Sequence, residues 1–221
     1  MPMNKKIFEK KWAAASVRLE KVTDAVGYPV EEGIKPTILA LWLLGFTTWN
    51  SCEGHFETSL TPFVDIHAPN KPAYRWDGEE VFEYKTLKAI GATKADILPG
   101  IKHKTEISDK YQDLLYLWQE KQGWKHSKTY LVWLLKSHAL TMKLARLVTV
   151  FNYKFPHKSC LVSVSGGKLE IWDKWINLDK VTVQNGKLNA SEKRSIIMRL
   201  NIRKKVMRQF TDFLVQEVKK K

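Results

Sequence analysis

The architecture of this chain is clearest in the segment Ile38-Leu-Ala-Leu-Trp-Leu-Leu-Gly-Phe-Thr-Thr-Trp-Asn-Ser-Cys-Glu-Gly-His55. The apolar residues before Gly45 occupy every side of a helix, which indicates a buried helix that starts near Pro36. β-Branched and aromatic residues at 46–49 then predict a short strand that runs into a polar turn at 50–55. Residues 62–67 alternate apolar with polar side chains, so we expect a second strand beside the first.

Two longer helices flank this segment in the sequence. Residues 4–24 carry apolar side chains near helical spacing among lysines and glutamates, and Gly27-Tyr-Pro29 ends the run. Residues 191–221 have an N-cap candidate at Asn189 or Ser191 and then an apolar stripe suited to packing on a core. We therefore expect helices at the N-terminus and one long helix at the C-terminus.

The middle of the chain has a weaker pattern. Prolines and glycines interrupt residues 68–110, which predicts an irregular or mobile insertion with one short helix. Residues 111–120 are typical of an amphipathic helix. The apolar runs at 129–135 and 144–153 fit either two strands or one helix across 130–148.

The clearest hairpin lies at 160–172, where two alternating strands surround Gly166-Gly167. A further strand is expected at 180–184, because it ends at the turn pair Asn185-Gly186. Together these elements predict a single α+β domain over residues 1–221, with an antiparallel or mixed sheet, N-terminal helices and a long basic C-terminal helix.

The composition favours a basic protein of the cytoplasm. Lys and Arg number 37 against 23 Asp and Glu, and the formal net charge of +14 indicates polyanionic partners such as RNA, DNA or an anionic membrane surface. Cys52 and Cys160 lack the spacing of a disulfide framework or a zinc knuckle, so we expect a reducing compartment. The longest apolar run, 38–46, is shorter than the roughly 20 residues of a membrane span, and we expect neither membrane insertion nor secretion.

Half of the excess charge lies in the last segment, which carries ten basic and three acidic residues. This pattern fits two interpretations: a solvated helix face, or a surface that contacts the phosphate backbone of a nucleic acid. In the second interpretation the contacts come from Arg194, Arg199, Arg203, Lys204, Lys205 and Arg208.

The turn at 47–55 gathers a thiol, a carboxylate, an imidazole and a hydroxyl directly after the expected helix and strand. Turns held by a rigid scaffold commonly carry function. One interpretation makes Cys52 a nucleophile with His55 as its base, because a thiolate at neutral pH needs a nearby imidazole. A second adds Asp65 and His67 from the next strand, which completes the thiol, imidazole and carboxylate donors that suit zinc.

Two further interpretations of this turn involve no nucleophile or metal. The turn can bind a cofactor or ligand through backbone N–H groups, with Gly54 allowing close approach and Ser51, Glu53 and His55 supplying hydrogen bonds. It can also be a polar turn that buries Cys52 and satisfies His55 by hydrogen bonding. No residue pattern identifies a particular cofactor.

Two other stretches of the sequence combine residue types that bind phosphate or bases. Ser165-Gly-Gly-Lys168 lacks the spacing of a phosphate-binding loop and no helix is expected after it, so we predict a hairpin turn. Trp124, His126, Tyr130 and Trp133 fit either an aromatic core or a stacking and cationic surface for single-stranded nucleic acid. The lysines interleaved with them are Lys121, Lys125 and Lys128.

Residues 27–36 and 40–55, followed by Pro62-Phe-Val-Asp-Ile66, resemble a family of uncharacterised small bacterial proteins. That family shares a G-I-K, helix, L-G, T-x-x-S-C-E-G-H and P-[WFY]-V-D-I pattern. Its last helix is similar to Met207-Arg-Gln-Phe-Thr-Asp-Phe-Leu214. The resemblance spans both ends of the chain and implies a shared fold and a shared site, without an assigned activity.

Residues 38–55 are also similar to the opening of the wybutosine-synthesis tRNA methyltransferases, where a helix leads into T-T-S-S-C-S-G-R. The residues that match this motif are Thr47, Thr48, Ser51, Cys52 and Gly54. The residues that depart from it are Trp49, Asn50, Glu53 and His55, the last of which replaces an arginine. This resemblance implies an RNA substrate and a ligand-binding turn.

We therefore predict an intracellular, nucleic-acid-associated protein, specifically an RNA-modifying enzyme such as a transferase, with RNA favoured over DNA and no membrane partner. Its expected catalytic residues are Cys52, Glu53, His55 and Asp65, and its expected cofactor-binding residues are Ser51 and Gly54. The alternatives are a metal-dependent or cysteine hydrolase of a small substrate, and a non-catalytic interaction protein. The reaction and the oligomeric state stay open at this point.

Overall fold

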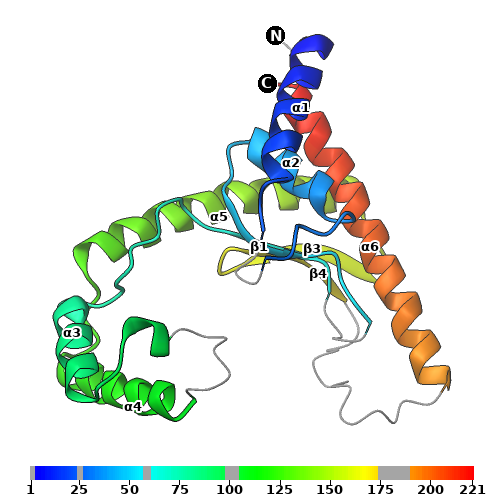
Figure 1. The fold of residues 1–221 in the computed structure, drawn as a ribbon. Helices are drawn as coiled ribbons and strands as arrows, with labels where there is room; N and C mark the ends of the chain where they lie inside the picture. The colour runs from blue at the N-terminus through cyan, green and yellow to red at the C-terminus, as the bar shows by residue number, and fades with distance from the viewer. Residues whose placement is uncertain (1–2, 24–26, 57–60, 98–104, 174–189) are drawn as a thin grey trace. The chain divides into compact units, whose positions relative to one another are not determined.

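The computed structural model describes residues 3–23, 27–56, 61–97, 105–173 and 190–221 (Figure 1). Within these ranges the chain is a mixture of helices and one antiparallel sheet, as the α+β prediction requires. The elements in chain order are α1 (Lys5–Leu19), α2 (Lys35–Leu43), β1 (Thr48–Cys52), β2 (Phe63–Ile66), α3 (Glu79–Ala89), η1 (Lys94–Asp96), α4 (Thr105–Lys121), α5 (Lys128–Lys154), β3 (Cys160–Ser165), β4 (Lys168–Asp173) and α6 (Ala190–Lys219).

The sheet has the strand order β1-β2-β4-β3, and all of its neighbouring strands are antiparallel. β1 pairs with β2 as predicted, with Cys52 opposite Phe63. β3 and β4 form the expected hairpin, whose turn uses Gly166 and Gly167 at positive φ. β1 covers residues 48–52, so the strand expected at 46–49 lies further along the chain, and only residues 53–55 of the expected polar turn follow it. These residues leave the sheet at the end of an edge strand, where loops are free to carry functional groups.

The contacts of the chain divide it into two compact units. Unit 1 comprises residues 1–68 and 136–221, and unit 2 comprises residues 69–135. Unit 1 contains the sheet together with α1, α2, α6 and the second part of α5.

The core of unit 1 lies between α2, α6 and the sheet. α2 is buried almost all round because its side chains are apolar on every face, and it packs against both α1 and α6. Phe210 of α6 is fully buried and meets Phe151 of α5 edge to face at 5.0 Å. The two ends of the chain lie side by side (Figure 1), and the Met3 backbone N–H donates to the Lys219 carbonyl at 2.9 Å.

Unit 2 contains α3, η1, α4 and the first part of α5. α3 packs on α4 through Phe82 and Trp118, whose rings stack at 4.8 Å. Glu79 accepts hydrogen bonds from the backbone N–H groups of Arg75 and Trp76, and it thereby fixes the chain before α3. α3 is the short helix expected within residues 68–110.

One ambiguous prediction is resolved in favour of a helix. Residues 129–135 and 144–153, which also fitted two strands, both belong to α5. The buried positions Tyr130, Trp133, Ser137, Leu144, Val148 and Phe151 are separated by 3, 4, 7, 4 and 3 residues, which is the spacing of one helix face. The strand expected at 180–184 and the N-cap candidate Asn189 lie outside the described residues. Among the helices that the structure describes, none is both long and apolar enough to cross a bilayer.

Candidate functional site

The turn after β1 meets the loop that precedes α2, and the two segments hold each other by reciprocal hydrogen bonds. The backbone N–H of Glu53 donates to the Glu31 carboxylate at 2.6 Å. In return, the backbone N–H of Gly33 donates to the Glu53 carboxylate at 2.7 Å. Charge-assisted hydrogen bonds of this kind are stronger than neutral ones, so the two segments are fixed relative to each other.

This arrangement brings three potential metal ligands together. A carboxylate oxygen of Glu31, the sulfur of Cys52 and a ring nitrogen of His55 all lie within 4.8 Å of one another. The His55 Nε2 atom also contacts the Oε1 atom of Glu31. The Cys52 side chain is buried, whereas the side chains of Glu31 and His55 are 35% and 37% exposed. The cluster is therefore anchored in the core and open to solvent on one side.

The electrostatic surroundings keep the Cys52 thiol protonated. Burial raises the pKa of this thiol, and the nearby Glu31 and Glu53 carboxylates raise it further. The N–H of Gly54 donates to the sulfur at 3.3 Å and lowers the pKa, but this effect is smaller than that of burial. A thiol in such surroundings is a weak nucleophile, whereas a bound cation would favour its thiolate form.

Gly54 allows Leu200 and Pro62 to pack closely against the backbone of the turn. Its φ of +91° is left-handed, and a Cβ atom there would lie 2.9 Å from both Leu200 and Pro62. The space that the glycine leaves is therefore filled by side chains of this chain. Ser51, the other expected cofactor-binding residue, is half-buried and pairs with Val64 in the sheet.

The remaining expected site residues, Asp65 and His67, are not donors of this cluster. Asp65 is opposite Lys168 in the β2–β4 register, and burial raises the pKa of its carboxyl group. Of the expected metal set, the structure thus brings Cys52 and His55 together and supplies the carboxylate from Glu31.

Basic residues of α6 reach the turn from one side. Lys204 lies 3.6 Å from the second oxygen of the Glu53 carboxylate. Lys204 and Arg208 line a small cleft of about 80 Å³ together with Glu53 of the turn and Gly33 of the loop before α2. The candidate site is therefore bordered by positive charge.

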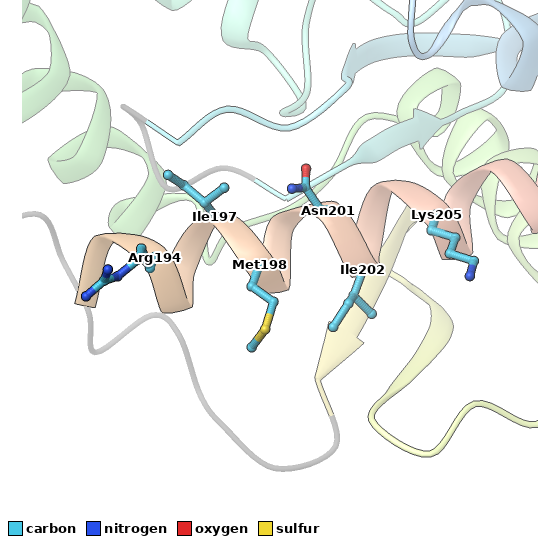
Figure 2. Close-up of a pocket in the computed structure, with 6 residues that line it drawn as sticks. All are labelled: Arg194, Ile197, Met198, Asn201, Ile202 and Lys205. Carbon is cyan, nitrogen blue, oxygen red and sulfur yellow. The ribbon is translucent and has the colours of Figure 1, made fainter. Parts of the chain in front are cut away.

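The basic residues expected to contact phosphates differ in their exposure. Arg194, Lys205 and Arg208 are exposed, Arg199 and Lys204 are half-buried, and Arg203 is buried. A groove of about 460 Å³ lies on α6. Figure 2 shows its lining residues, with Arg194 and Lys205 at the two ends. Apolar side chains also line this groove, and they include the exposed Ile197 and Met198.

Sequence reasoning missed Glu31, the carboxylate of the cluster. Glu31 precedes Cys52 by 21 positions, and a helix and a strand lie between them in the sequence. No rule based on residue spacing predicts a contact between two residues separated in this way. Its one signal was its place within residues 27–36, a segment in which the sequence analysis predicted a resemblance to small bacterial proteins.

Comparisons with protein families, with curated proteins and with solved structures gave no match.

Proposed function

We propose that this protein is a zinc-dependent hydrolytic enzyme that modifies RNA, with its metal held by Glu31, Cys52 and His55. The observation that carries the proposal is the convergence of these three donor atoms within 4.8 Å. In tetrahedral zinc sites the metal–ligand distances imply donor separations of roughly 3.4–3.6 Å. A shift of about 1 Å in these side chains would therefore bring the donors to ligating positions.

The donor set is the chemical reason for choosing zinc. Thiolate, imidazole and carboxylate are zinc's usual ligands, whereas magnesium and calcium prefer oxygen alone. Oε1 of Glu31, which now contacts His55, is the oxygen available to a metal, because the other carboxylate oxygen accepts the Glu53 N–H. Glu53 itself is engaged by Gly33 and Lys204, so its expected role becomes that of a positioning residue.

Three protein ligands suit a catalytic site better than a structural one. Structural zinc sites are closed by four protein ligands, whereas catalytic sites leave one position for water or substrate. When bound in such a site, zinc lowers the pKa of a coordinated water to near neutrality, which enables hydrolysis with water as the co-reactant. The partial exposure of Glu31 and His55 is consistent with access from solvent.

The choice of RNA as substrate is supported by charge. The net charge of +14 and the exposed Arg194, Lys205 and Arg208 on α6 favour a polyanion, and Arg208 also lines the cleft beside the turn. The similarity of residues 38–55 to the tRNA methyltransferases favours RNA over DNA.

Native mass spectrometry combined with RNA analysis tests the proposal. The gently purified protein should carry one zinc ion, and Cys52→Ser and His55→Ala variants should not. The matched control is Cys160→Ala, since Cys160 is also a buried cysteine and lies outside the cluster. Nucleoside analysis of bulk RNA incubated with the zinc-loaded protein should show a product that the Cys52→Ser variant does not form. Zinc-free parent protein, or identical products from parent and variant, would refute the proposal.

A hydrolase of a small substrate is the second candidate, and the small size of the cleft favours it. A volume of about 80 Å³ accommodates a single phosphate or carboxylate group rather than a nucleotide. Zinc-dependent hydrolysis of a chromogenic phosphodiester, with no change to RNA, would support this candidate over the first.

A further inference from the structure

Six rings of unit 2 form a continuous series in which each ring centroid lies 4.4–5.5 Å from the next. In order they belong to Tyr116, Trp124, Trp76, His126, Tyr130 and Trp133. The side chains of Trp76, Tyr130 and Trp133 are buried, whereas Trp124 is 43% exposed and Tyr116 is 55% exposed. The series is thus an aromatic core that opens to solvent at one end.

The backbone at Trp124 is strained in a way that α4 does not require. The C-terminus of α4 has a Schellman motif, with Gly123 N–H bonded to the Glu120 carbonyl and Trp124 N–H bonded to the Gln119 carbonyl. This motif needs one left-handed residue, which Gly123 supplies with a φ of +63°. Trp124 follows with a φ of +56°, a conformation that is unfavourable for a bulky side chain. Strain of this kind persists where surrounding contacts hold a side chain in a required position.

Contacts on both sides hold the Trp124 ring. Tyr116 and Trp76 each meet it nearly edge to face, with interplanar angles of 73°. Trp76 is in turn stacked on His126 at 4.4 Å, and the Arg75 guanidinium lies 4.6 Å from its centroid. The exposed ring therefore projects from a rigid aromatic support.

Three lysines are close to Trp124 in the sequence. Lys121, Lys125 and Lys128 are exposed, and none of them forms an ion pair with any residue that the structure describes. Residues 116–128 contain one acidic residue, Glu120, against these three. The segment therefore combines exposed aromatic rings with cations that are available to an anionic partner.

We propose that Trp124 and Tyr116 stack on unpaired bases of single-stranded nucleic acid, while Lys121, Lys125 and Lys128 contact its phosphates. This inference takes the class of substrate from the proposed function but does not depend on the metal. Rigid aromatic platforms bordered by lysines are the usual means of binding single strands, because every base offers a face for stacking. In a duplex the bases are already stacked on one another, so a paired strand would gain only the phosphate contacts.

Fluorescence anisotropy measurements of short RNA binding test this site. They are made at a salt concentration that suppresses non-specific contacts. The probe is a single-stranded oligonucleotide of mixed sequence, compared with an abasic oligonucleotide of the same length and charge. The parent protein should bind the intact strand more tightly, and its tryptophan fluorescence should fall on binding. Trp124→Gly should weaken binding of the intact strand by about 5- to 150-fold and leave the abasic strand unaffected.

Glycine is chosen at position 124 because it tolerates the positive φ, so the variant removes the ring without adding backbone strain. Tyr116→Ala is the second variant, since its exposed ring can be removed at lower cost to folding. Trp172→Ala, which removes a 52% exposed tryptophan from unit 1, is the matched control and should bind like the parent.

Equal binding of the intact and abasic strands by the parent would overturn the inference. Unchanged binding by both Trp124→Gly and Tyr116→Ala would also overturn it. Binding of polyglutamate as tightly as the RNA strand, and independently of Trp124, would overturn it as well and would indicate an acidic protein partner. Glu31→Gln should retain the stacking signal, so failure of the metal site and failure of the stacking site give different results.

Discussion

Replacement of Glu31 by glutamine separates the two roles that the structure gives to this side chain. One carboxylate oxygen accepts the Glu53 N–H at 2.6 Å, and the other contacts the His55 ring and is the proposed zinc ligand. Glutamine keeps an oxygen acceptor for the N–H but carries no negative charge, so it is a poor ligand for a divalent ion.

Two losses are expected in this variant, one in zinc affinity and one in the stability of the metal-free protein. Four-ligand zinc sites bind with about 10–16 kcal/mol, or roughly 2.5–4 kcal/mol per ligand, so loss of one ligand should weaken zinc binding roughly 100-fold or more. The stability of the metal-free protein should fall by only about 1 kcal/mol, because a charge-assisted hydrogen bond becomes a neutral one. Exposure of a third of the Glu31 side chain reduces this cost further, since water can replace lost contacts.

Competition with a zinc-chelating dye measures the affinity, and urea denaturation of the metal-free protein measures the stability. Glu32→Gln is the matched control, because this neighbouring carboxylate is 86% exposed, pairs with Lys35 and lies outside the cluster. Equal zinc affinity of Glu31→Gln and the parent, or an equal loss in Glu32→Gln, would refute the assignment of Glu31 as a ligand.

Three further predictions concern the scaffold and the metal. Gly54→Ala should lower the free energy of unfolding by about 2–4 kcal/mol, because a Cβ atom would add left-handed strain and press on Leu200 and Pro62. Gly27→Ala, which has a similar φ but no atom within 4 Å, should cost only about 1 kcal/mol, and equal losses in urea denaturation would contradict this account. Phe210→Ala should cost about 3–5 kcal/mol in the same assay, since its ring is fully buried in the core of unit 1, and a loss below that range would show that the core is packed differently. Removal of zinc with a chelator should lower the melting temperature of the parent, because the metal binds the folded state alone, and no change on chelation would contradict a metal-stabilised turn.

The elements that the sequence predicted well are those whose pattern is strong over their whole length. α2 is apolar on every face and has Pro36 in its first turn, so both its burial and its start followed from the sequence. The β3–β4 hairpin combined strict alternation with two glycines at its centre. α5 was ambiguous because short apolar runs fit a strand or a helix, and the choice depends on which side chains find neighbours in the fold.

The candidate site was predicted only in part, because some of its residues are close in sequence and others are brought together by the fold. Cys52 and His55 are close in sequence, so a single turn is enough to bring them together. Glu31 joins them only because a loop, a helix and a strand fold back on one another, and its reciprocal bonding with Glu53 cannot be inferred from spacing. Asp65 was predicted as a site residue because the neighbouring strand was expected beside the first, but it lies opposite Lys168 and is not one of the three donors of the cluster.

X-ray absorption spectroscopy at the zinc edge of the purified, metal-loaded protein tests the central claim most directly. A site formed by Glu31, Cys52 and His55 predicts one zinc per chain with a single sulfur at about 2.3 Å and nitrogen or oxygen neighbours at about 2.0–2.1 Å. The sulfur should disappear in Cys52→Ser and persist in Cys160→Ala. A first shell without sulfur in the parent, or one that Cys52→Ser leaves unchanged, would contradict the proposed metal centre.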